Sequence, residues 1–136
     1  MRPIAVQTIQ ELEGVDYGEP TYDSFVVTNT HRLRRVPIKQ FTLDDLRFMV
    51  LQKQGLPWLV PRALAHLEQH PLAEGTFYRG DLLNAVMEIP DDWWAQHPDL
   101  RARMGPVLQA ALARIHKIKF AEDLEAKIRA ATPRFA

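Results

Sequence analysis

The chain has 136 residues, 46% of them apolar, and its 17 Lys and Arg balance 17 Asp and Glu. This size fits a single domain, 1–136, with one core. A formal charge of zero argues against a surface that binds nucleic acid or anionic lipid everywhere, though not against a local patch. The absence of cysteine excludes disulfides, thiolate zinc sites and cysteine nucleophiles. No apolar run approaches the roughly 20 residues of a membrane span, and no secretory signal opens the sequence, so we expect a cytoplasmic protein.

Ten prolines and six glycines divide the chain into short segments, which predicts short helices with tight connections. Residues 1–23 are acidic and broken by glycine and proline, which indicates an ordered loop after a short N-terminal segment. Residues 24–35 contain a β-branched run that fits a strand. The same residues fit a helix capped by Asp23 or Ser24 and stopped by Pro37, and we favour the helix.

The next segments have clearer helical spacing. Thr42 is a good N-cap residue, and acidic residues follow it in the first turn, where the helix dipole favours them. Apolar positions then recur every three or four residues up to Gly55. We expect the following helix to begin near Pro61, because proline lacks the amide hydrogen that a helix interior needs, and to end at Pro71.

Residues 71–80 indicate a connection, after which Asp81 is expected to cap a short helix. Asp91 is expected to cap a single turn, and Asp99 a longer helix. In that longer helix, Gly105-Pro106 should produce a kink or a break.

A final helix should carry Phe120, Leu124 and Ile128 on one face. The sequence contains no convincing strand pair and no Asn-Gly or Asp-Gly hairpin dipeptide. The predicted fold is therefore all-α, a single compact irregular bundle of about six short helices.

Candidate catalytic groups are few. His66 and His70 would share a helix face, but zinc needs further ligands, and their spacing does not match the His-Glu-x-x-His motif. The single serine is Ser24, and no phosphate-binding glycine loop is present. Paired carboxylates such as Asp44 and Asp45 are explained by helix starts. The sequence predicts no enzyme, no metal site and no cofactor, and a small hydrolase or metal enzyme built on the two histidines is the least favoured hypothesis.

Charge is distributed unevenly along the chain. Residues 68–99 have a net charge of −6, residues 100–136 have +5, and residues 31–40 hold four basic side chains and no acid. One interpretation is that these charges pair inside the fold, the N-terminal acids with the basic run at 32–39. The other is that an acidic face steers a basic partner into place.

Two tryptophans follow the Asp91-Asp92 pair. Neighbouring helical positions point about 100° apart. One of Trp93 and Trp94 should therefore fill the core, and the other, beside carboxylates, suits an exposed interface anchor. The alternative is that both rings pack inside.

Several sequence blocks point to one family. The first is Leu12-Glu13-Gly14 followed by Gly18-Glu19-Pro20-Thr21-Tyr22-Asp23-Ser24. The later blocks are Leu33-Arg34-Arg35 with Pro37, Phe41-Thr42 with Asp45-Leu46-Arg47, Gln54-Gly55-Leu56-Pro57 with Leu59-Val60-Pro61, Ala63-Leu64, Pro71-Leu72-Ala73-Glu74-Gly75, and Tyr78-Arg79-Gly80-Asp81-Leu82-Leu83. In order and spacing this run over residues 9–90 resembles the immunity proteins of bacterial contact-dependent growth inhibition (CDI) systems.

The resemblance implies a cytoplasmic binding protein without enzymatic activity or cofactor. Its partner would be the toxic C-terminal domain of a large surface protein delivered by neighbouring cells, commonly a nuclease and often one acting on tRNA. The shared residues are architectural rather than catalytic, and Arg34 is expected to pair with an acid of the loop at 11–19.

A nuclease needs a basic cleft for phosphates, and an acidic surface bearing aromatic residues would complement it. Segment 88–94 is the first candidate face, and the N-terminal loop is the second. The candidate toxin-binding residues are Glu88, Asp91, Asp92, Trp93, Trp94, Glu74, Glu11, Glu13, Asp16, Tyr17 and Glu19. No small-molecule substrate and no membrane is expected as partner, and nucleic acid is not expected as the main partner either. The alternative function is a nucleic-acid-binding or regulatory module that uses the basic stretches 32–39 and 101–134.

Overall fold

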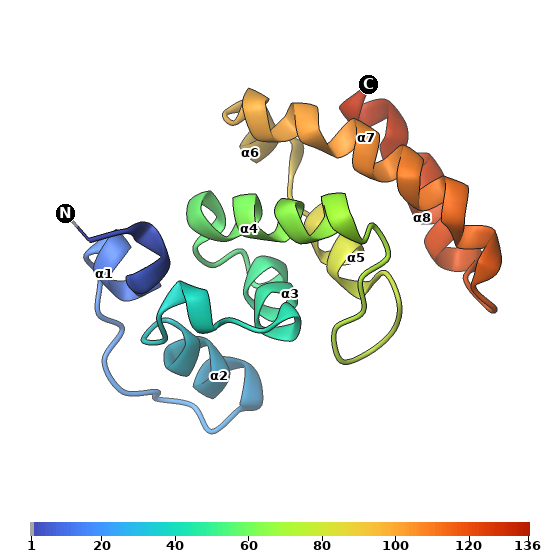
Figure 1. Ribbon diagram of the computed structural model, residues 1–136. Helices are drawn as coiled ribbons and strands as arrows, with labels where there is room; N and C mark the ends of the chain where they lie inside the picture. Colours follow the sequence, from blue (N-terminus) through green and yellow to red (C-terminus); the bar gives the residue numbers. More distant parts are fainter. Residues whose placement is uncertain (1) are drawn as a thin grey trace.

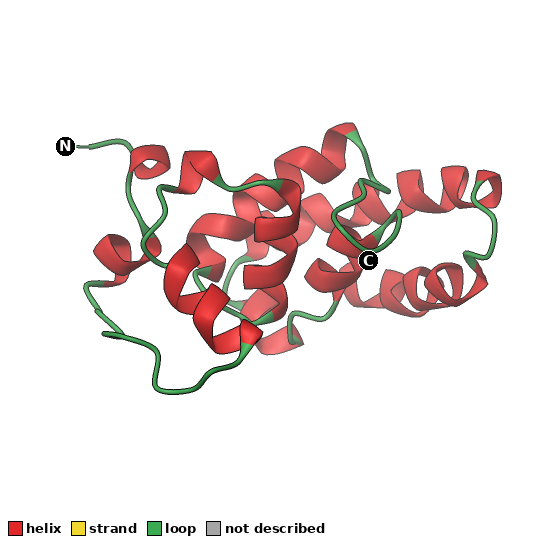
Figure 2. Cartoon of the chain, turned by 90° about the horizontal axis from the view of Figure 1, so that it is seen from below, coloured by secondary structure: helices red, strands yellow, loops and turns green. Residues whose placement is uncertain are grey.

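The computed structural model describes residues 2–136, and every regular element in them is helical (Figures 1 and 2). The α-helices are α1 (Ile9–Glu13), α2 (Phe25–Leu33), α3 (Leu43–Leu51), α4 (Leu56–Gln69), α5 (Asp81–Met87), α6 (Asp91–Ala95), α7 (Pro98–Arg114) and α8 (Glu122–Ala131). The 3-10 turns are η1 (Ile4–Val6), η2 (Ile38–Gln40), η3 (Ile115–Lys117) and η4 (Thr132–Phe135). Within residues 2–136 no strand forms, and one isolated bridge joins Glu74 and Arg79. The predicted all-α fold is confirmed.

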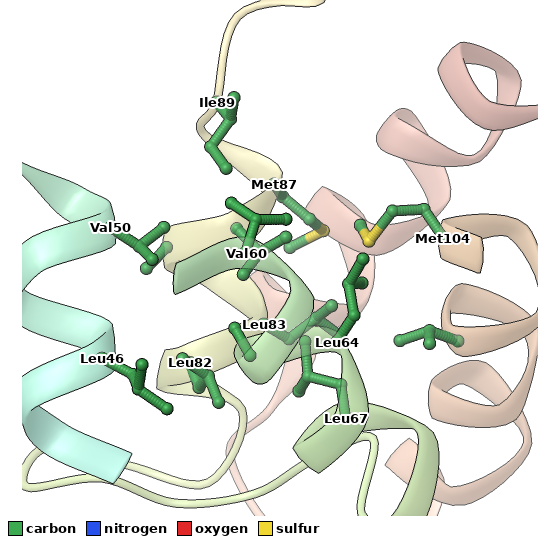
Figure 3. Packing of buried hydrophobic residues seen from close by; sticks show 14 of the residues in the cluster. Leu46, Val50, Val60, Leu64, Leu67, Leu82, Leu83, Met87, Ile89 and Met104 are labelled. Carbon is green, nitrogen blue, oxygen red and sulfur yellow. The ribbon is translucent and has the colours of Figure 1, made fainter. Parts of the chain in front are cut away.

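The core lies between α3, α4, α5, α7 and α8. α3 packs on α5 and α4, and α4 packs on α7, which in turn contacts α8 (Figure 1). Apolar side chains from these helices point toward one another (Figure 3). Among them, Leu64, Leu82, Leu83 and Met104 have no exposed surface. Burying a side chain of this size stabilises a fold by roughly 1.5–3 kcal/mol, so this cluster accounts for much of the driving force for folding.

The predicted helix at 24–35 is confirmed, and the strand alternative is not. Ser24 caps α2, since its hydroxyl accepts a hydrogen bond from the Val27 amide at 3.2 Å. Thr42 caps α3 as predicted and forms a capping box, in which Asp45 accepts the Thr42 amide hydrogen at 3.0 Å. These local bonds satisfy amides that a helix start leaves without partners.

The prediction that a helix begins near Pro61 is wrong, and of the kink or break expected at Gly105-Pro106 the break does not form. α4 begins at Leu56 and runs through Pro61, and α7 runs unbroken through Pro106. Each internal proline removes one helical hydrogen bond, to the carbonyl four residues earlier. Those residues, Pro57 and Ala102, are both exposed, so water can satisfy their carbonyl groups. The lost hydrogen bonds thus cost little, and the burial of the apolar faces of α4 and α7 is enough to keep both helices intact.

Three predicted caps are also wrong. α5 is capped by Gly80, α6 by Pro90 and α7 by His97, so Asp81, Asp91 and Asp99 lie inside the first turns instead. Acidic residues in a first turn still interact favourably with the helix dipole. Their side chains are consequently free to bond elsewhere, and two of them do so.

The sequence predicts Phe120 on the buried face of the last helix, and this is wrong. Phe120 lies before α8, with a positive φ of 60° and 92% of its surface exposed. Leu124 and Ile128, which complete the predicted stripe, are buried. The stripe therefore starts with α8 itself, because the chain reverses direction between η3 and α8 (Figure 1). Over the part of the chain that the structure describes, no helix is long and apolar enough to span a membrane.

Candidate functional site

The acidic N-terminal loop is tied to the fold by Arg34, whose side chain is 1% exposed. Its guanidinium lies 2.6 Å from Glu13 Oε1 and donates to Gln54 Oε1 and to the Val15 carbonyl, both at 3.0 Å. The same group lies 3.8 Å from the centre of the Tyr17 ring. The prediction that Arg34 pairs with an acid of this loop is confirmed.

Other acids of the loop are paired as well. Arg35 lies 3.4 Å from carboxylate oxygens of both Asp16 and Glu19. A hydrogen bond from the Gly18 amide, followed by those from Arg35, lowers the pKa of Asp16 below its usual value. Glu11 meets Arg2 at 2.6 Å. Three N-terminal acids, Glu13, Asp16 and Glu19, thus pair with the 32–39 run as the interpretation of charge pairing inside the fold predicts, whereas Glu11 pairs with Arg2. The loop presents less free charge than its sequence suggests.

A second acidic surface surrounds α6. We define the acidic ridge as the exposed carboxylates of Glu88, Asp91, Asp92 and Asp99. Asp91 meets Arg134 Nε at 2.7 Å. Within residues 2–136 the other three have no cation within 4 Å, and Asp92 accepts only the Trp93 amide hydrogen, at 2.9 Å. The acidic ridge therefore keeps most of its charge available.

The two tryptophans beside the acidic ridge differ in burial: Trp94 fills the core as predicted, whereas Trp93 is only partly exposed and also packs against the core. Trp94 is 1% exposed and packs edge-on against Phe135, with ring centroids 5.2 Å apart. Trp93 is half-buried and stacks on His97, with centroids 3.9 Å apart. Trp94 therefore supports the surface from beneath, and Trp93 is the ring that a partner can reach.

The connection between α4 and α5 is held by two carboxylates. Asp81, only 3% exposed, accepts amide hydrogens from Gly75 at 2.7 Å and from Phe77 at 3.0 Å. Asp44 accepts from the Thr76 amide at 3.0 Å and from Arg47 at 2.7 Å. The Arg47 bond, then that of Thr76, lowers the pKa of Asp44. This loop is therefore fixed in shape. The Asp81 contacts are local, whereas Asp44 lies 32 residues from Thr76 and its contact leaves no local signal in the sequence.

Sequence reasoning also missed a basic cleft at the C-terminal end of α7. It consists of two adjoining pockets of about 500 and 490 Å³, which share Glu74, Arg79 and Ile118. Five basic side chains line it: Arg79, Arg114, Lys117, Lys119 and Lys127. Tyr78 and Phe120 line the second pocket, and burial, more than the nearby carboxylates, raises the pKa of the Tyr78 hydroxyl. Glu74, a candidate toxin-binding residue, lies here and not on the acidic ridge.

Among the described residues, the two histidines predicted to share a helix face do not form a metal site with other side chains. His66 and His70 are both exposed. Within residues 2–136 no group of three or more His, Asp or Glu side chains is placed to hold a metal ion.

The fold and surface define an all-helical protein whose charged side chains are arranged for binding. A family model of CDI immunity proteins matches residues 11–104, and the chain belongs to this family. Searches of curated proteins and of solved structures gave no match. Family membership supports an immunity role in which the protein binds a cognate CDI toxin, and such immunity proteins are generally not enzymes. The matched residues include the whole acidic ridge.

Proposed function

We propose that this protein neutralises a nuclease toxin by covering the toxin's phosphate-binding surface with the acidic ridge. The partner is the C-terminal toxin domain of a CDI surface protein, met in the cytoplasm. The immunity protein then acts by occlusion alone, with no catalytic group and no cofactor of its own. Occlusion of an active site or substrate surface requires only that a complementary surface bind tightly and stay bound.

The observation that carries this proposal is the uncompensated charge of the ridge. Glu88, Asp92 and Asp99 are exposed and lack a cationic partner within residues 2–136, whereas the acids at 11–19 are largely engaged by arginines. A nuclease surface that binds phosphates is basic, so the ridge offers the complementary sign. Trp93 stands among these carboxylates, and tryptophan is enriched among the residues that dominate binding energy.

The ridge is also held in place before any partner arrives. Arg134 donates to the carbonyl oxygens of Met87 at 2.8 Å and Ile89 at 2.9 Å, and pairs with Asp91. Trp94 fills the space beneath. A surface that is already ordered loses less conformational entropy on binding. This favours the subnanomolar affinity, on the order of 12 kcal/mol or more, that neutralising a lethal enzyme demands.

The N-terminal loop remains a second candidate contact. Tyr17 is 45% exposed above Arg34. The pairs of Asp16 and Glu19 with Arg35, at 3.4 Å, lie at the surface, where ion pairs contribute little and can be exchanged for a partner's cations. Glu11 and Glu13 are more firmly held, by a capping box and by Arg34 respectively.

The test compares Asp92→Lys with Glu122→Lys. Both acidic residues are exposed and lie in the first turn of a helix, so both changes have a similar helix-dipole cost. The cognate toxin domain is expressed with each variant in bacterial cells, and the association rate of the purified pair is measured over a range of salt concentrations.

We expect Asp92→Lys to slow association, to flatten its salt dependence and to weaken protection of growth, with Glu122→Lys close to wild type. Equal behaviour of the two variants would remove the acidic ridge as the binding surface. Failure of the wild-type protein to protect cells would overturn the immunity role itself.

A further inference from the structure

The basic stretches of this chain are not equivalent once the fold is known. In the run at 32–39, Arg34 and Arg35 are occupied by acids of the N-terminal loop. By contrast, none of the five basic side chains of the basic cleft has a carboxylate within 4 Å among the described residues. The ion pairs of residues 2–136 are all formed by other arginines. The cleft, and not the 32–39 run, is where positive charge remains available.

The composition of the cleft favours an anionic ligand. Its two pockets hold five basic side chains against the carboxylates of Glu74 and Asp123, which leaves a net charge of +3. His70 also lines it. The acidic ridge, which includes Asp92, lies beside the start of α7, whereas Arg114 ends that helix. At 1.5 Å per residue, the 17 residues of α7 span about 25 Å, which separates the carboxylates beside its start from Arg114. Glu88 is the exception, because it shares a pocket with Lys127.

Aromatic rings lie among these cations. Phe120 is 92% exposed and Tyr78 is 44% exposed, and both line the same pocket as Lys119 and Lys127. Tyr78 belongs to the connection that Asp81 holds, and its amide donates to that carboxylate at 3.4 Å. One ring is therefore fixed beside the cationic side chains, and the other projects into solvent next to it.

Phe120 is costly for the protein by itself. Its φ of 60° lies in the left-handed region, which a bulky side chain rarely adopts. The exposed ring gains almost no burial to offset that strain. Strained residues persist where the surroundings hold them, and they concentrate at binding sites. The exposed ring of Phe120 is therefore available for a ligand to stack on.

We propose that the basic cleft binds single-stranded nucleic acid, with phosphates against its lysines and arginines and bases stacked on Phe120 and Tyr78. Proteins that bind single strands combine a positive groove with aromatic platforms in this way, because every base offers a flat face. An acidic protein surface would also satisfy the cations, so an acidic peptide is measured as the competing ligand in the test. Four of the five cations of the cleft and Phe120 follow residue 104, outside the residues matched by the family, whereas Arg79 and Tyr78 lie within them. The proposal does not rest on the immunity role.

The test measures fluorescence anisotropy of a labelled single-stranded RNA of about 16 nucleotides, the upper end of known site sizes. The same length of single-stranded DNA, duplex RNA and a polyglutamate peptide are measured in parallel. Lys117→Glu removes positive charge from the cleft, Phe120→Ala removes the ring, and Phe120→Trp retains one. Lys39→Glu is the matched control, since Lys39 is exposed and lies on η2, outside both pockets.

We expect binding at about 50 mM salt that weakens steeply toward 200 mM. In Lys117→Glu, the slope of log K against log salt concentration should be smaller by about 0.7 for each phosphate that the variant no longer neutralises. Phe120→Ala should bind roughly five-fold or more weakly, while Phe120→Trp and Lys39→Glu stay near wild type. Tighter binding of RNA than DNA would identify RNA as the ligand, and equal binding would indicate single strands in general.

Four results would overturn the proposal: no binding at the lowest salt, no effect of Phe120→Ala, equal weakening in Lys39→Glu, or preference for the duplex or for polyglutamate. Variants that melt well below the wild type are replaced by Lys119→Glu, a second exposed cation of the cleft. The acidic ridge is unchanged in all of these variants, so toxin neutralisation is tested separately from nucleic-acid binding.

Discussion

Replacement of Arg34 by methionine tests whether the N-terminal loop is held by a buried charge. The guanidinium makes an ion pair with Glu13 and hydrogen bonds to Gln54 and the Val15 carbonyl. Methionine is of similar length and keeps the apolar part of the side chain packed. The substitution therefore removes the charge and its hydrogen bonds while leaving only a small cavity.

The size of the effect follows from the burial of each partner. Breaking a buried pair by removing one member costs roughly 3–5 kcal/mol, because the other charge is left unpaired. The Glu13 side chain is 30% exposed, so it regains some water and the destabilisation falls to about 2–3 kcal/mol. For a chain of this length that corresponds to a melting temperature lower by roughly 10 °C.

Urea unfolding followed by circular dichroism measures this destabilisation for Arg34→Met, Glu13→Gln and the double variant. We expect Glu13→Gln to be at least as destabilising, because it leaves the buried charge of Arg34 unpaired, although Gln54 and the Val15 carbonyl still accept from it. The sum of the two single effects should exceed the effect of the double variant, as it does for coupled residues. A destabilisation below about 0.5 kcal/mol in Arg34→Met, the usual range for surface changes, would refute the reasoning.

Two further predictions concern the connection between α4 and α5. Asp81→Asn should lower the free energy of unfolding by about 2 kcal/mol, since a carboxamide cannot accept from every amide that the buried carboxylate satisfies; thermal unfolding checks this against Asp123→Asn, an exposed control. Because Arg47 and Thr76 lower the pKa of Asp44, its contribution is present above the unfolded carboxyl pKa and disappears as pH falls through the folded value. The stability gap between wild type and Asp44→Asn should therefore shrink in acid, and a constant gap contradicts this.

The helical fold could be predicted because its signals are local. Apolar spacing and the hydroxyl groups of Ser24 and Thr42 identify α2 and α3 within a few residues. Proline is misleading for the opposite reason. Whether Pro61 and Pro106 end a helix depends on how much the rest of that helix buries, and tertiary packing determines this.

The surfaces are harder to predict than the fold. The charge of segment 88–99 and the burial of one of its two tryptophans follow from the sequence. The neutralisation of the loop at 11–19 can be predicted from the sequence only in part, through the expected pairing of Arg34 with an acid of that loop. The basic cleft combines the connection before α5 with the chain around η3, and such long-range juxtaposition leaves no local pattern.

The arrangement of charge along α7 has a consequence for how partners first meet this protein. Carboxylates gather beside the start of the helix and cations beyond its end, in the same sense that favours each sign at those ends. A charged partner therefore meets an uneven field, although the formal net charge is zero. The orientation of a first encounter then depends on charges across the surface and not on any one residue.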